Sequence, residues 1–154
     1  MSARKIALTL AWCLVAVAVC YAGNPNMGTW KMDESKSKLP AGITKNTTVV
    51  YSSAGDETKV ITDGTTGDGK PAHTEWTGKF DGKDYPLTGD PAANTRSYTI
   101  INDHSTELTN KMNGKVTATG RITISSDGKT RTVKVSGTAP DGKKFSYTAY
   151  YDKQ

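Results

Sequence analysis

The sequence predicts an all-β protein, an antiparallel up-and-down β-barrel of about nine to ten strands. Two observations lead to this prediction. Short polar triplets recur along the chain and mark tight turns, because their glycine supplies the positive φ that such turns need. Between the triplets, apolar and polar residues alternate with a period of two, which is typical of half-buried strands. The triplets, Asp-Gly-Lys or Asn-Gly-Lys, begin at Asp68, Asp81, Asn113, Asp127 and Asp141.

The alternating segments justify the strands in order. A short segment opens the series, and the next two are joined by the turn at 54–57. Segments that follow are separated by the triplets or by other short polar stretches, and threonine, which favours strands, is abundant in them. The pattern predicts strands over 28–32, 47–52, 58–63, 72–80, 84–87, 96–101, 107–112, 115–125, 131–137 and 145–151.

The short connections decide how these strands assemble. Neighbours joined by tight turns pair antiparallel, and a long meander with one apolar face must bury that face. Closure into a barrel buries it and also removes the exposed sheet edges. A β-sandwich is the alternative architecture.

The first 22 residues have the features of a signal peptide. Arg4 and Lys5 precede an apolar run over 6–20, and small residues before a polar segment indicate cleavage after Ala22. A lipoprotein signal at Cys20 is a weaker alternative, because the residues before it lack the usual Leu and the small neighbour. We therefore expect a secreted or periplasmic protein with one domain over 23–154. Cys13 and Cys20 are the only cysteines, so the mature domain has no disulfide.

Charge excludes some partners. Loss of Arg4 and Lys5 leaves a net charge of +3 in place of the +5 of the whole chain. The basic residues are dispersed, and the longest basic run is Lys143-Lys144, which is unlike a nucleic-acid footprint. We expect no nucleic-acid partner, no stable membrane insertion once the signal is removed, and a monomer.

No motif predicts catalysis. The segments 64–70 and 137–143 fit G-x-x-x-x-G-K, but neither continues with Ser or Thr and a helix, as a phosphate-binding loop requires. His73 and His104 are isolated on different segments, and no inward pair of carboxylates is evident. We expect neither an enzyme nor a bound metal or cofactor.

Several residues are predicted to point into the barrel. Small inward residues, among them Gly78, Gly137 and Ala149, either leave a cavity or make room for large aromatic rings, and the sequence leaves both open. Arg96 and Arg131 are either a clamp for a ligand carboxylate, or one packs on Trp30 while the other reaches water. The candidate ligand-binding residues are Trp76, Phe80, Arg96, Tyr98, Arg131, Phe145 and Tyr147.

Two terminal motifs carry a family resemblance. Gly28-Thr29-Trp30-Lys31 opens the domain and Tyr150-Tyr151-Asp152-Lys153 closes it. Together with the strand order, they resemble the calycin superfamily of lipocalins, fatty-acid-binding proteins and small secreted bacterial lipocalin-like proteins. The resemblance implies that Gly28 and Trp30 are structural, with Trp30 at the closed end of the barrel and an arginine stacked on it.

The departures from that family limit what carries over. Residues 33–44 are too few for the two-helix lid of fatty-acid-binding proteins, and Ala149 stands where those proteins place a carboxylate-binding arginine. The fold is therefore expected to carry over better than the ligand chemistry. We expect a binding protein for a small hydrophobic or amphipathic molecule, such as a lipid, in the barrel interior. The alternative is a filled barrel that acts as a structural or protein-interaction module of the cell envelope.

Overall fold

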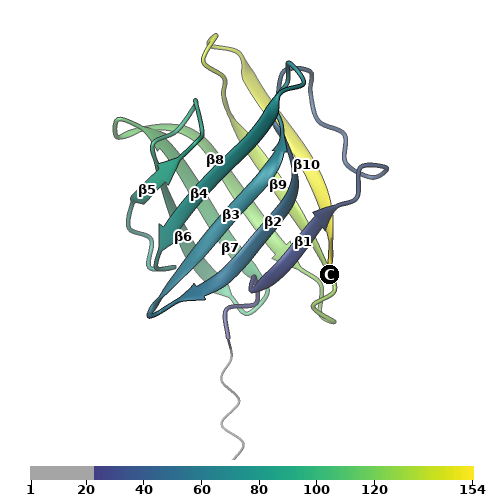
Figure 1. Cartoon of the computed structure of the whole chain (residues 1–154), viewed down its shortest axis with the longest axis vertical. Helices are drawn as coiled ribbons and strands as arrows, with labels where there is room; N and C mark the ends of the chain where they lie inside the picture. Colours follow the sequence, from purple (N-terminus) through teal and green to yellow (C-terminus); the bar gives the residue numbers. More distant parts are fainter. Residues whose placement is uncertain (1–22) are drawn as a thin grey trace, which may run out of the picture.

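The computed structural model describes residues 23–154, which form a closed antiparallel barrel (Figure 1). The predicted signal peptide, its cleavage after Ala22 and the lipoprotein alternative at Cys20 concern residues outside this described part. The strands are β1 (Gly28–Met32), β2 (Lys45–Ala54), β3 (Glu57–Thr65), β4 (Pro71–Gly78), β5 (Tyr85–Thr88), β6 (Thr95–Asn102), β7 (Ser105–Met112), β8 (Lys115–Ile124), β9 (Thr130–Thr138) and β10 (Lys144–Lys153).

Each strand pairs with its neighbour in sequence, and β1 closes the ring between β2 and β10. Trp30 illustrates the closure, because it lies opposite Val49 of β2 on one side and Lys153 of β10 on the other. The predicted up-and-down barrel is confirmed, and the sandwich alternative is not adopted. Within residues 23–154, no helix is long and apolar enough to cross a membrane.

The recurrent triplets are turns, as predicted. Gly69, Gly82, Gly128 and Gly142 all have a positive φ, between 70° and 85°. In three of the triplets the aspartate carboxylate accepts a hydrogen bond from the backbone N–H of the lysine two residues later, at 3.0–3.1 Å. The aspartate therefore fixes the turn locally, and its recurrence needs no binding role to explain it.

Two sequence expectations about side-chain direction and one about the end of a strand are wrong. Val116 is 50% exposed and Ile100 is 43% exposed, although both were predicted to face inward with their alternating neighbours. Each lies beside a register shift, between β7 and β8 or between β6 and β7, where a β-bulge interrupts the alternation. The predicted strand over 72–80 ends at Gly78, so Phe80 lies in the β4–β5 connection.

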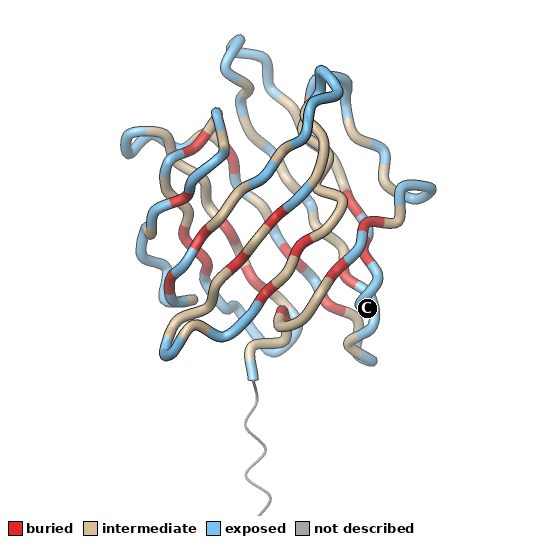
Figure 2. The backbone as a smooth tube through the Cα atoms, in the orientation of Figure 1, coloured by how far each residue is buried: buried red, intermediate tan, exposed pale blue. Residues whose placement is uncertain are grey.

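The small inward residues make room for rings. A methyl group on Gly78 would lie 2.4 Å from the ring of Tyr85, and one on Gly137 would lie 2.9 Å from the ring of Phe145. Buried positions recur at intervals along the strands, as Figure 2 shows, and form one core inside the barrel. These glycines therefore accommodate aromatic packing in the wall.

One end of the barrel is closed. Trp30 is fully buried there, and its indole N–H donates to the carbonyl of Asn26 at 2.7 Å. The Asn26 side chain is also buried and donates to the hydroxyl of Thr106 at 3.0 Å. The segment before β1 therefore seals the end at which β1 begins and at which the C-terminus lies (Figure 1). The sequence prediction that Trp30 is buried is confirmed.

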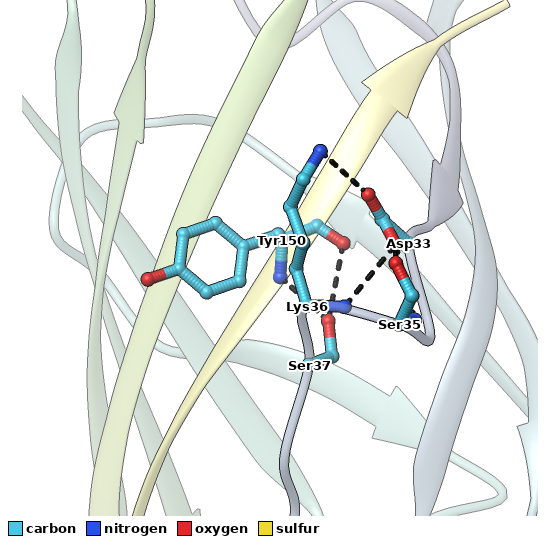
Figure 3. Close-up of polar contacts among 5 residues, drawn as sticks. All are labelled: Asp33, Ser35, Lys36, Ser37 and Tyr150. Carbon is cyan, nitrogen blue, oxygen red and sulfur yellow. Dashed lines mark hydrogen bonds and ion pairs between the residues drawn. The ribbon is translucent and has the colours of Figure 1, made fainter.

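The segment 33–44 runs from β1 to the opposite end and is not helical. It begins with a turn in which the Asp33 carboxylate accepts from the backbone N–H groups of Ser35 and Lys36 (Figure 3). The Ser37 hydroxyl then accepts from the backbone N–H of Tyr150 at 2.9 Å. We call 33–44 the strap, because it is fastened along β10 where fatty-acid-binding proteins would have a lid.

Candidate ligand-binding cavity

The barrel encloses a cavity of about 880 Å³ that opens at the end opposite Trp30. The opening lies among the β3–β4 turn, the β5–β6 loop, the β9–β10 turn and the end of the strap, which lie together at the top of Figure 1. Among the described residues at the opening are Ile43, Thr44, Gly67, Asp68, Asp90, Pro91 and Pro140. The interior is therefore accessible from one end only of the described barrel.

Arg96 provides a cation on the wall of this cavity. Its Nε donates to the Asn110 side-chain oxygen at 2.6 Å, and one Nη lies 3.3 Å from the Tyr98 hydroxyl. The Arg96 backbone carbonyl also accepts from the indole N–H of Trp76 at 2.9 Å. Two hydrogen bonds thus orient the side chain while it still lines the cavity, and the third fixes the backbone of β6 beside it.

Four tyrosines contribute to the lining of the cavity. Tyr51, Tyr98, Tyr147 and Tyr151 all line it, and three of them are buried. Burial raises the pKa of Tyr51 and Tyr151 well above the ordinary value, and it also raises the pKa of Tyr147. These phenols therefore remain protonated and can donate hydrogen bonds inside the barrel.

Arg131 lies deeper and is held by aromatic rings. Its guanidinium carbon lies 4.9 Å from the ring centre of Trp30, 5.3 Å from that of Tyr51 and 4.6 Å from that of Tyr151. It is only 3% exposed, and its Nε and one Nη have no hydrogen-bond partner among the described residues. Cation–π contacts therefore replace hydrogen bonds for this group.

The two arginines have different surroundings, as in the sequence alternative in which only one of them packs on Trp30. Arg131 packs on Trp30 at the closed end. Arg96, by contrast, points into the open cavity beside Tyr98 and Asn110. The inward direction predicted for both side chains is confirmed, while a role for either in ligand binding stays a prediction.

Trp76 and Phe80, two of the candidate ligand-binding residues, lie outside the cavity lining. The Phe80 ring stacks on Tyr98 with centroids 4.7 Å apart, and the Trp76 ring meets Tyr98 edge-on at 4.8 Å. The ring of Tyr85, on β5, packs against the ring of Trp76 with centroids 5.8 Å apart. This cluster fills the interior beside the cavity and supports its wall through Tyr98.

The other three aromatic candidates, Tyr98, Phe145 and Tyr147, do line the cavity. Phe145 and Tyr147 lie two residues apart on β10, so they share its inner face, and their rings stack with centroids 6.2 Å apart. Both are partly accessible, unlike Trp76 and Tyr98. They form an aromatic strip on the wall near the opening.

Sequence reasoning missed several polar lining residues, among them Tyr51 and Asn110. A signal for these two was present, because Tyr51 shares strand parity with Val49, and Asn110 lies between Leu108 and Met112 on the inward face of β7. A polar residue at an inward position of a strand is the feature that could have identified Asn110.

His73 forms hydrogen bonds with two carboxylates. The His73 side chain lies between two carboxylates, with Nδ1 2.6 Å from Asp63 and Nε2 3.2 Å from Glu75. All three side chains are about half exposed. Among residues 23–154, no group of three or more side chains is arranged to hold a metal ion.

Comparisons with known proteins give little beyond this geometry. No protein-family model matches the chain, and no curated protein matches it. The chain is similar to a redesigned β-barrel, mFAP1, bound to DFHBI, at 20% identity and a TM-score of 0.47, covering 86% of this chain and 98% of that one. It is similar to EF1p2_mFAP2b bound to DFHBI at 15% identity and the same TM-score, covering 86% and 97%. The barrel assignment rests on the strand pairing of this chain, and the calycin resemblance stays a prediction.

Proposed function

We propose that this chain is an exported binding protein that holds a small hydrophobic or amphipathic molecule inside its barrel. The observation that carries the proposal is the cavity of about 880 Å³ with one open end. Small-molecule sites are typically concavities of roughly 300–1,000 Å³ with an apolar lining and a few placed polar groups. The cavity has both the size and the composition of such a site.

The lining favours an amphipathic occupant over a purely apolar one. Apolar side chains from several strands, among them Val49, Leu108, Ile122, Val133 and Phe145, provide contact area. Arg96, Asn110 and the tyrosine hydroxyls are placed among them and have to be solvated or hydrogen-bonded. A molecule with one polar head and an apolar body matches both requirements.

The alternative function, a ligand-free module of the cell envelope, depended on a barrel filled by its own side chains. Its support in the sequence was the absence of a two-helix lid, the alanine at position 149 in place of an arginine, and an exterior rich in threonine and lysine. The open interior therefore favours the binding protein. His73 lies on β4 and His104 lies in the β6–β7 turn, and two histidines on different segments favour a binding function over a catalytic one.

Export is part of the proposal and rests on the sequence of residues 1–22. The intact mass of protein purified from cells expressing the whole chain tests it, because cleavage after Ala22 gives a product that begins at Gly23. An uncleaved mass in all cell fractions contradicts export by this route.

The binding test uses the same purified protein. We expect saturable binding of a fluorescent fatty acid, and displacement of this probe by an unlabelled amphiphile. Mass spectrometry of an organic extract should also detect a co-purifying amphiphile. Absence of saturable binding to fatty-acid, retinoid and haem probes, together with an empty extract, overturns the proposal.

A further inference from the structure

The cavity contains two positive charges with no negative partner. Arg96 of β6 and Arg131 of β9 both line it. None of the ion pairs among residues 23–154 involves either arginine. A buried guanidinium without an anion loses hydration that its neutral partners replace only in part. The interior is therefore electrostatically unbalanced in a way that an anionic occupant would correct.

The acidic residues of the lining lie at the opening. Asp68 forms its ion pair with Lys70 in the β3–β4 turn. Asp90 accepts a hydrogen bond from the backbone N–H of Ala92 at 2.8 Å within the β5–β6 loop. Asp90 is near enough to favour the charged form of Arg96, but neither carboxylate forms an ion pair with that guanidinium in the described structure. The donors of Arg96 that face the cavity therefore have no carboxylate of the lining in contact with them.

Only one of the two arginines is free to contact a ligand. Arg131 is enclosed by the rings of Trp30, Tyr51 and Tyr151 and is almost fully buried. Arg96 is partly accessible and uses Nε and one Nη for Asn110 and Tyr98, both uncharged groups. A planar guanidinium has five N–H donors, so it retains donors for a further acceptor on the cavity side.

We infer that the molecule bound in this barrel is an amphiphile with a monoanionic head group such as a carboxylate, and that Arg96 contacts that head group. The inference rests on the proposed function and adds the charge and position of the ligand head. Asn110 and Tyr98 position the guanidinium. Arg131 adds positive potential from below but remains part of the closed end.

A comparison of head groups on one alkyl chain tests the charge preference in the unmodified protein. Isothermal titration calorimetry at about pH 8, where a carboxylic acid is ionised, is carried out with dodecanoate, dodecanol and dodecylamine. A charge-assisted hydrogen bond in an enclosed site favours dodecanoate over dodecanol by at least about tenfold in Kd. Dodecylamine should bind more weakly than dodecanol.

Substitution of Arg96 tests the position. Arg96→Met keeps much of the apolar stem and removes the charge, and it should reduce the preference for dodecanoate to nearly one while dodecanol still binds. The matched control is Arg121→Met on β8, whose arginine is 51% exposed and pairs with Glu107 outside the barrel. That variant should keep the full preference. Arg96→Lys retains the charge without the planar group and should keep part of it.

The outcomes separate the two proposals. Equal binding of dodecanoate and dodecanol to the unmodified protein overturns the inference and leaves the binding function standing. Full preference in a folded Arg96→Met variant also overturns the assignment to Arg96. If none of the three probes binds, the proposed function fails and the inference fails with it. Should Arg96→Met not fold, the head-group ratio of the unmodified protein and of Arg96→Lys decides.

Discussion

Arg131 and Arg96 show how surroundings give one side chain two different roles. Three aromatic rings hold the guanidinium of Arg131 at 4.6–5.3 Å, which fixes it and leaves little surface for any other partner. Arg96 is fixed by an amide and a phenol and keeps one side toward the cavity. Stacking suits a group that closes an end of the barrel, whereas directed donors suit a group that contacts a ligand.

His73 gives a prediction at the same scale. Its hydrogen bond with Asp63, which has the larger effect, and its hydrogen bond with Glu75 raise the pKa of His73 above the ordinary 6.5. Because the charged form is favoured in the folded state, the contribution to stability is fully present below about pH 6.5. It is lost as the pH rises through the folded pKa.

An NMR titration of the His73 ring measures this directly. We expect a midpoint above 6.5 in the native protein and a lower midpoint in Asp63→Asn, which removes the stronger partner. A midpoint at or below 6.5 in the native protein contradicts the two-carboxylate geometry.

At the scale of elements, the strap connects the end of β1 to the cavity opening without forming a helix. It leaves β1 at the Asp33 turn, where Lys36 and Ser35 lower the pKa of the Asp33 carboxyl to about 2. It then follows β10 through Ser37 and the bridge between Lys38 and Thr148. Its last residues reach the cavity opening, so its hydrogen-bonded contacts with β10 help to position part of the rim.

Ser37→Ala tests this attachment. The change removes the hydroxyl that accepts from the Tyr150 backbone N–H, and a hydrogen bond of this kind contributes about 1 kcal/mol. Hydrogen exchange at the Tyr150 amide should therefore become faster by up to about tenfold, with a small change in Tm. Ser53→Ala, which alters a hydroxyl near the β2–β3 turn, is the control and should leave the Tyr150 amide unchanged. Unchanged exchange in Ser37→Ala shows that the strap is not held there.

The sequence predicted all ten strands because turn chemistry and alternation act locally. The Asp127 and Asp141 triplets turn the chain, and the parity of β9 correctly placed Arg131 inside. Val116 and Ile100 were misplaced because a bulge depends on how two strands pair, which no single segment encodes. Phe80 was assigned to a strand for a similar reason, since the end of β4 depends on its pairing with β3.

The cavity itself was beyond sequence reasoning. The volume of the cavity depends on the side-chain conformation that each aromatic residue adopts in the closed barrel. The alternation of a strand predicts only which face of the strand a side chain is on. Trp76 and Phe145 have the same inward parity, yet the first is buried beside Tyr98 and the second lines the open space. Ring contacts among β4, the β4–β5 connection, β5 and β6 bury Trp76 and so decide this difference.

For the whole molecule, the two ends of the barrel have different roles. The closed end contains the buried indole of Trp30, the stacked Arg131 and the buried Asn26, and it has no opening among the described residues. The open end has the loops, the strap and the cavity mouth. Residues 23–154 contain no cysteine, so the packing of the core has to provide the stability that disulfides give many exported domains.

Trp30→Ala tests this separation of stability from binding. Loss of a large aromatic side chain from a core typically costs about 3–5 kcal/mol, out of about 5–15 kcal/mol for a domain of this kind. It also removes one of the three rings that hold Arg131. We therefore expect Tm to fall by about ten degrees or more, with or without ligand. Asp127→Ala in the β8–β9 turn loses only exposed hydrogen bonds and should lower Tm by less than half as much.

Well below its Tm, Trp30→Ala should still prefer dodecanoate to dodecanol, because Arg96 and the open end are unchanged. If Trp30→Ala instead keeps the native Tm and loses ligand binding, then Trp30 belongs to the ligand site and the assignment of the closed end to stability is wrong.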